Sequence, residues 1–193
     1  MIPLWIKIVY TLFAVITVAV YAVKYPLGNF LWFSDIALVL TVPALWLESS
    51  LLASMTAVGI LLPETFWNAE YFVRLLAGKR LGGLTDYMFD ARNPLYLRAL
   101  SLFHVFLPVL LLWMISRLGY APEALIGQTA LAWVVLPLTY RFVAPDLNVN
   151  WVHGHGSEAG QWMPPLVRLG LLMIGYPVLL YLPTHLLLRE LFG

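Results

Sequence analysis

Four side chains capable of chemistry interrupt the apolar stretches of this sequence. They are Ser34 and Asp35 in "FLWFSDIALVL", Glu64 in "LLPETFWN" and His104 in "LSLFHVFLP". A serine and a histidine on two different helices can act together as nucleophile and general base. An ionisable side chain inside a membrane costs about 2.5–3.5 kcal/mol on insertion scales, and it usually faces a bundle interior or a wet cavity. We therefore take Ser34 as the candidate nucleophile and His104 as the candidate base.

The composition indicates an integral membrane protein. The 193 residues are 62% hydrophobic and 11% charged, whereas about a quarter of the residues of a soluble domain are charged. No cysteine is present, which excludes disulfides, thiol catalysis and cysteine-based metal sites. The net charge of +1 gives no indication of a nucleic-acid partner. We expect membrane lipid as the partner and no cofactor, while the composition does not indicate an oligomeric state.

Hydropathy predicts a single domain, residues 1–193, with an all-α fold of six transmembrane helices. The first apolar stretch is interpreted as an uncleaved span rather than a signal peptide. The half-polar segment 68–93 predicts an interfacial amphipathic helix between spans three and four, ended by Gly82 and Gly83. The six expected spans are 3–23, 29–47, 50–67, 94–116, 123–143 and 164–188.

The basic residues predict the orientation of these spans. An even number of spans places both termini on one side of the membrane. Eight Lys and Arg residues fall on the other side and three on the side of the termini. The positive-inside rule therefore predicts that both termini face away from the cytoplasm. The eight are Lys24, Arg74, Lys79, Arg80, Arg92, Arg98, Arg141 and Arg168.

This topology brings polar groups from four spans and one loop into the cytoplasmic half of the bundle. We expect them to line a cavity that opens to the cytoplasmic leaflet. Pro108 deprives the carbonyl of His104 of its helical donor, and this is either a common membrane-helix kink or a device that helps to open the cavity. Besides the candidate pair, the residues concerned are Asp35, Glu64, Arg141, Asn148 and Asn150.

Each supporting residue has a structural alternative. Asp35 either pairs with Arg98 or Arg141 to fix helix packing, or has a role in catalysis, in which it orients a neighbouring group or holds one of these arginines near a lipid head group. It is not expected to share the face of Ser34, because adjacent helical residues point about 100° apart. Asn148 and Asn150 are candidate donors to an oxyanion. Ser34 can instead serve as a small residue at a close helix contact.

The remaining polar residues are expected to have simpler roles. Glu64 lies close enough to the interface to be only solvated. His153 and His155 in "VHGHG" are a weak metal signal, and His185 is expected at the membrane interface. Asp35, Glu64 and His104 have ligand chemistry but none of the usual metal spacings, so no metal is expected.

Three segments resemble the bacterial YwaF-type integral membrane proteins. They are "FLWFSDIALVL", "LSLFHVFLPVLLLW" and "NVNWVHGHG" followed by "WMPPLVRLG". That family is related to androgen-induced membrane hydrolases of fatty-acid esters of hydroxy fatty acids and to a vertebrate plasmalogen acyltransferase. "NFLWFSDIAL" and "GLTDYMFD" also resemble segments of uncharacterised bacterial membrane-associated proteins. The resemblance implies the nucleophile position for Ser34, the base for His104, and the loop asparagines for Asn148 and Asn150. It also implies a location in the bacterial inner membrane.

Two functions follow as hypotheses. The first is an intramembrane acyl hydrolase or acyltransferase that acts on a lipid through Ser34 and His104. The alternative is a non-catalytic membrane protein that binds or transports a lipid or small molecule. In that case the polar cluster is a ligand pocket or a packing network.

Overall fold

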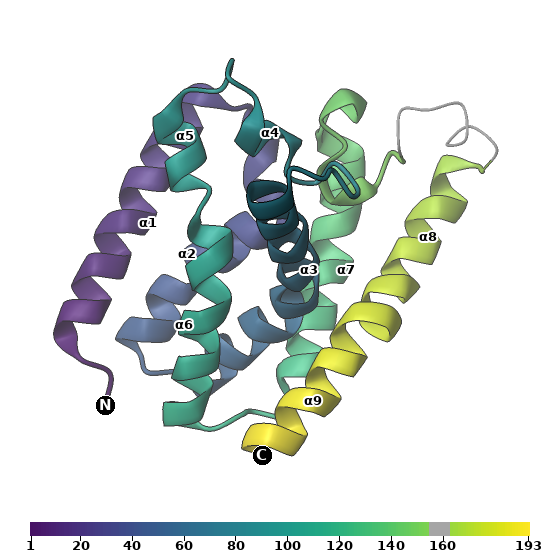
Figure 1. Ribbon diagram of the computed structural model, residues 1–193. Helices are drawn as coiled ribbons and strands as arrows, with labels where there is room; N and C mark the ends of the chain where they lie inside the picture. Colours follow the sequence, from purple (N-terminus) through teal and green to yellow (C-terminus); the bar gives the residue numbers. More distant parts are fainter. Residues whose placement is uncertain (155–162) are drawn as a thin grey trace.

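The computed structural model describes residues 1–154 and 163–193, and within these ranges every regular element is helical (Figure 1). Both termini lie at one end of the bundle, and α4 and α5 lie at the other. In chain order the elements are α1 (Leu4–Lys24), η1 (Leu27–Leu31), α2 (Phe33–Trp46), α3 (Ser50–Ala77), α4 (Asp86–Phe89), α5 (Leu95–Leu100), α6 (Phe103–Leu118), α7 (Ala124–Phe142), η2 (Pro145–Leu147), η3 (Val149–Trp151), α8 (Pro165–Gly175), the π-helical segment η5 (Tyr176–Tyr181) and α9 (Leu182–Phe192).

Four helical segments of the described chain are long and apolar enough to cross a membrane. They are α1, α3, α5 together with α6, and the continuous helix from α8 through α9. The all-α membrane fold expected from the sequence is confirmed at this level. The other two expected spans correspond to α2, which is apolar but only 14 residues long, and to α7, which has 19 residues but is less apolar. Six spans are therefore not confirmed.

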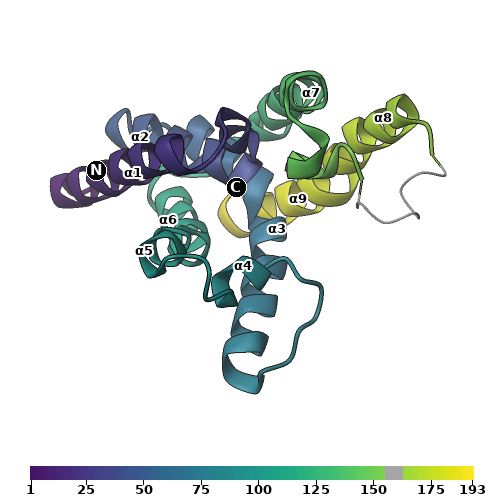
Figure 2. The same ribbon diagram turned by 90° about the horizontal axis from the view of Figure 1, so that it is seen from above.

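Helix α3 is the central element of the bundle. It packs against α2, α6 and α7, and Figures 1 and 2 show it between α6 on one side and α7 and α9 on the other. Half of its most apolar stretch is buried, against 22% for α1 and for the C-terminal helix. The outer helices instead present large apolar side chains such as Leu12 and Leu179 to the outside. This arrangement suits a lipid environment, where apolar side chains need not be hidden.

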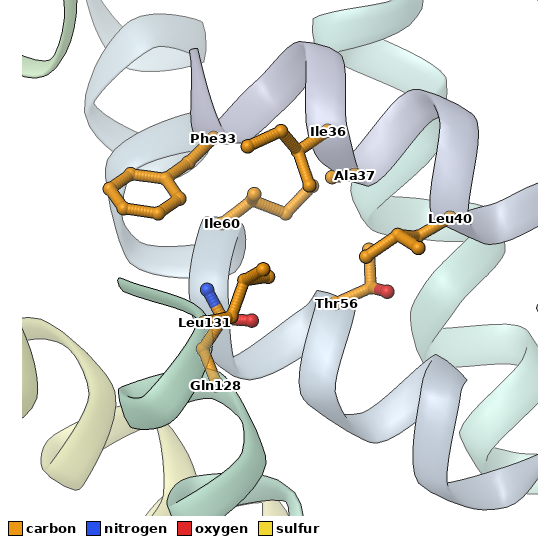
Figure 3. A pocket seen from close by; sticks show the side chains of 8 residues that line it. All are labelled: Phe33, Ile36, Ala37, Leu40, Thr56, Ile60, Gln128 and Leu131. Carbon is orange, nitrogen blue, oxygen red and sulfur yellow. The ribbon is translucent and has the colours of Figure 1, made fainter. Parts of the chain in front are cut away.

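Small residues on α3 permit the close approach of α7. Figure 3 shows Gln128 of α7 and Thr56 of α3 at a small cavity that also touches α2. A Cβ atom added at Gly59 would lie 2.4 Å from Nε2 of Gln128, so only glycine fits beneath this side chain. Gln128 is itself buried and donates a hydrogen bond to the hydroxyl of Tyr181 at 3.5 Å.

The separate amphipathic helix expected within 68–93 does not form. Instead α3 continues to Ala77 and ends at Gly78, whose φ of 67° gives the left-handed conformation that stops the helix, well before Gly82 and Gly83. The chain then folds back along α3, and the carboxylate of Glu70 holds it there. Its Oε1 accepts a hydrogen bond from the backbone N–H of Gly83 at 2.7 Å, and its Oε2 accepts one from Leu84 at 3.2 Å.

Candidate active site

A large cavity lies at the end of the bundle opposite the termini. Its volume is about 810 Å³, which is within the usual range for a small-molecule or lipid pocket. Ser34, Asp35, Glu64 and His104 all line it, so the cavity expected from the topology brings these four residues together. The other residues that line the cavity are Tyr21, Tyr25, Asn29, Trp32, Pro63, Phe66, Trp67, Gly83, Leu84, Tyr87, Asn93, Ser101, Phe103, Trp151, Leu172, Tyr176 and Leu180.

A carboxylate–histidine pair is the chemical centre of this cavity. Nδ1 of His104 lies 2.9 Å from Oε1 and 2.8 Å from Oε2 of Glu64. The side chain of Glu64 is 5% exposed and that of His104 is 14% exposed. The expectation that Glu64 is only solvated near the interface is therefore wrong, because α3 and α6 pack closely enough to bury it against His104. An ionised carboxylate accepts from Nδ1–H and leaves Nε2 of the imidazole with a lone pair.

The ring of His104 is fixed in position by its neighbours. It stacks on Trp67 at a centroid distance of 4.7 Å and on Phe103 at 4.1 Å. Nδ2 of Asn68 donates hydrogen bonds to the carbonyl oxygens of Glu64 at 2.8 Å and of His104 at 2.7 Å. The carbonyl of His104 is the one deprived of a helical donor by Pro108. Asn68 thus satisfies the group that the proline leaves free, and it ties α3 to α6 beside the pair.

Ser34 and Asp35 occupy the first turn of α2. The span expected over residues 29–47 would place them one to two helical turns deep in the membrane. The structure instead has the short helix η1 followed by Trp32, whose ψ of 135° prevents a continuous helix. The backbone N–H groups of a helical first turn have no acceptor within the helix, and this applies to those of Ser34 and Asp35 in α2. Ser34 and Asp35 both line the cavity, as expected for the polar residues of this half of the bundle, although they are adjacent on the helix.

The carboxylate of Asp35 is buried and only partly satisfied. The residue is 5% exposed, and its Oδ2 accepts a hydrogen bond from Nδ2 of Asn29 at 3.3 Å. Its Oδ1 is buried and has no hydrogen-bond partner among the described residues. The two arginines considered as its partners lie elsewhere, since Arg98 donates to the carbonyl of Met88 and the Arg141 guanidinium lies over Phe142. Within 1–154 and 163–193 Asp35 forms no ion pair.

Asn150 has a structural role that the sequence did not suggest. Its Nδ2 donates to the carbonyl of Leu31 at 2.7 Å, and its Oδ1 accepts from the backbone N–H of Phe33 at 3.3 Å. Both ends of the amide are thus engaged, the residue is 1% exposed, and it is not among the residues that line the cavity, so its expected role as an oxyanion donor is not supported. It instead holds the start of α2, directly beside Ser34.

The other polar residues of the loop also serve its own structure. Oδ1 of Asn148 accepts the backbone N–H of His153 at 3.1 Å, and Asn148 does not line the cavity, so its expected role as an oxyanion donor is not supported. Arg141 is exposed and lies outside the cavity lining too. His153 stacks on Tyr140, and His155 falls outside the described residues. Among the residues described, no three His, Asp or Glu side chains come close enough to hold a metal.

His185 lies at the opposite end of the molecule, where its side chain is buried within the bundle. Its Nδ1 is 2.6 Å from the hydroxyl of Tyr120, which precedes α7. The pair joins α9 to the connection between α6 and α7. It is remote from the cavity and contributes to packing.

Several residues of the cavity wall were missed by sequence reasoning. The hydroxyls of Tyr21 and Ser101 are 2.9 Å apart and link α1 to the turn before α6. Tyr87 of α4 lies beside Ser101, and burial raises the pKa of its phenol well above the ordinary value, so it remains a hydrogen-bond donor. Tyrosines at an interface are so common in membrane helices that their positions carried no distinguishing signal.

Ser34 and His104 line the same cavity, but the structure shows no direct contact between their side chains. The described residues show no hydrogen bond between Ser34 and His104. Catalytic hydrogen bonds are often long in unliganded proteins and tighten when a substrate binds.

Comparison of the chain with family models, curated proteins and solved structures gives no match in any of the three.

Proposed function

We propose that this chain is a membrane-embedded acyl hydrolase or acyltransferase that acts on a lipid ester. The observation that carries the proposal is that Glu64 binds Nδ1 of His104 inside the cavity that Ser34 also lines. A carboxylate that holds one imidazole nitrogen leaves the other as a base, which is the arrangement of a serine hydrolase. The resemblance to YwaF-type proteins, which implies the nucleophile position for Ser34 and the base position for His104, agrees with this function.

The reaction would proceed in two steps, acylation of Ser34 and then resolution of the acyl-enzyme. Oγ of Ser34 attacks the carbonyl carbon of the acyl group, its proton passes to Nε2 of His104, and His104 then protonates the departing alcohol. The resulting acyl-enzyme is resolved by water in a hydrolase or by a second alcohol in an acyltransferase. The first-turn N–H groups of Ser34 and Asp35 are the proposed oxyanion donors, in place of the two asparagines.

The membrane placement belongs to the same proposal. We place α2 and α7 as the two remaining spans of a six-span protein in the bacterial inner membrane. Both termini lie at one end of the bundle, as an even number of spans requires. Most Lys and Arg residues fall at the other end, so that end, with the mouth of the cavity, would face the cytoplasm.

A fluorophosphonate probe tests the nucleophile directly. We expect the purified protein to be labelled, and Ser34→Ala to abolish labelling. Ser101→Ala is the matched control, because Ser101 lines the same cavity but bonds Tyr21. Labelling that persists in Ser34→Ala, or that disappears only in Ser101→Ala, would eliminate Ser34 as the nucleophile.

The second candidate is a lipid- or small-molecule-binding protein or transporter without catalysis. The missing hydrogen bond between Ser34 and His104 favours it, as does a cavity large enough for a ligand. Under this alternative no covalent adduct forms at any serine.

A further inference from the structure

The cavity has an unusual balance of charge. Two acidic residues, Asp35 and Glu64, line it, and no lysine or arginine is found among the described lining residues. The only basic group is His104, which already faces Glu64. The net charge of the Glu64–His104 pair is at most zero, because the carboxylate balances a protonated imidazole. The described walls therefore offer no further positive side chain to the carboxylate of Asp35.

Asp35 is the group that this imbalance leaves unsatisfied. A buried carboxylate is normally paired or fully hydrogen-bonded, because its desolvation is otherwise uncompensated. Oδ2 has only the long bond from Asn29, and Oδ1 has no partner in the described chain. The first turn of α2 offsets part of this charge through its backbone N–H groups. Because Asp35 lines the cavity, a cation bound there would supply the countercharge that the described side chains do not.

Aromatic rings surround the same space. The wall includes Tyr25, Trp32, Trp67, Tyr87, Trp151 and Tyr176, contributed by several different elements. The faces of such rings attract cations, and several rings together form the cages that bind quaternary ammonium groups. Anionic ligands are disfavoured by the same surfaces, because the ring faces and the carboxylates are both negative.

We infer that this cavity binds an organic cation, a quaternary ammonium or protonated amine, between the Asp35 carboxylate and the surrounding aromatic rings. The binding site does not depend on acyl transfer, and it exists whether or not Ser34 reacts. Such a cation can be a free solute or the head group of a lipid. The chemistry that recognises it is the same in both cases.

Calorimetric titration of the full chain in an uncharged maltoside detergent tests the inference. The probes are choline and 3,3-dimethylbutan-1-ol, which has the same shape but carbon in place of the charged nitrogen. We expect choline to bind at least about tenfold more tightly, the scale of one desolvated cation–π or charge contact. Equal affinities for the two, or no binding of choline up to millimolar concentration, would overturn the inference.

Variants locate the site. Asp35→Asn keeps the shape of the side chain but removes its charge, and we expect it to lose about tenfold or more in choline affinity. Asp146→Asn is the matched control, because Asp146 is exposed and lies outside the cavity. A thermal unfolding curve checks that Asp35→Asn is folded. If a folded Asp35→Asn protein binds choline as the wild type does, Asp35 is not the anchor and the inference fails.

A lipid pair identifies the source of the cation. Lysophosphatidylcholine that binds more tightly than choline, with lysophosphatidylglycerol much weaker, indicates a lipid head group, whereas binding of choline alone indicates a free solute. Equal binding of both lipids without any binding of choline would mean recognition by the acyl chain, against the inference. The two proposals have separate readouts, because choline titration measures binding without acyl transfer and fluorophosphonate labelling measures the nucleophile without choline.

Discussion

Replacing Asn150 tests how the start of α2 is held in place. Asn150→Ala removes the donor to the carbonyl of Leu31 and the acceptor of the Phe33 N–H. Each backbone group left without a partner costs about 1–3 kcal/mol, so for two groups we expect a loss of about 2–6 kcal/mol in the free energy of unfolding. The same variant should slow fluorophosphonate labelling, because Phe33 directly precedes Ser34.

Asn148→Ala is the matched control for this prediction. Both asparagines have a positive φ, 40° at Asn148 and 51° at Asn150, so the backbone strain of an alanine is similar at the two positions. Among the described residues the side chain of Asn148 accepts one hydrogen bond, from the N–H of His153 within its own loop, and we expect a loss of about 1–2 kcal/mol.

Denaturant unfolding in detergent micelles, followed by circular dichroism, measures both variants. Equal destabilisation by the two substitutions, or unchanged labelling in Asn150→Ala, would refute the argument that Asn150 positions Ser34. Asn150→Asp should destabilise the protein at least as much as alanine, because it buries a carboxylate whose second oxygen faces the carbonyl oxygen of Leu31.

Two further predictions concern the base and the core. Glu64→Gln should slow acylation of Ser34 by about 10²–10⁴-fold, because the amide no longer holds His104 in the productive tautomer. Glu190→Gln, at an exposed position, should leave the rate unchanged. Equal acylation rates for the wild type and both variants would remove Glu64 from the mechanism. Gly59→Ala should destabilise the fold by about 1–3 kcal/mol through its clash with Gln128, whereas Gly170→Ala, with no atom within 4 Å, should be neutral or slightly stabilising. The unfolding free energies check this pair, and a Gly59→Ala protein as stable as Gly170→Ala would contradict the close packing of α3 and α7.

The break in the chain before α2 is a feature of the fold that the sequence did not predict. Apolar residues run through Phe30 and Leu31 without interruption, so hydropathy predicts one helix from residue 29. The chain instead forms η1 and restarts at Phe33, and the hydrogen bonds that accompany this break come from Asn150, 117 residues after Phe33. A local pattern carries no information about a partner so distant. The segment "AEYFVRLLA" was likewise expected to form a separate amphipathic helix, but in the structure it is the last part of α3.

The sequence by itself determined the helical membrane character of this protein and the end of the bundle at which its reactive residues gather. Those properties depend on hydropathy and span length, which are local. Only the tertiary structure decided that Glu64, rather than solvent, faces His104, that Asp35 meets no arginine, and that Asn150 serves α2 instead of a substrate. Span counting gives the depth of a residue in the membrane. Which residues meet depends on how each helix is rotated about its axis, and close packing between helices sets that rotation.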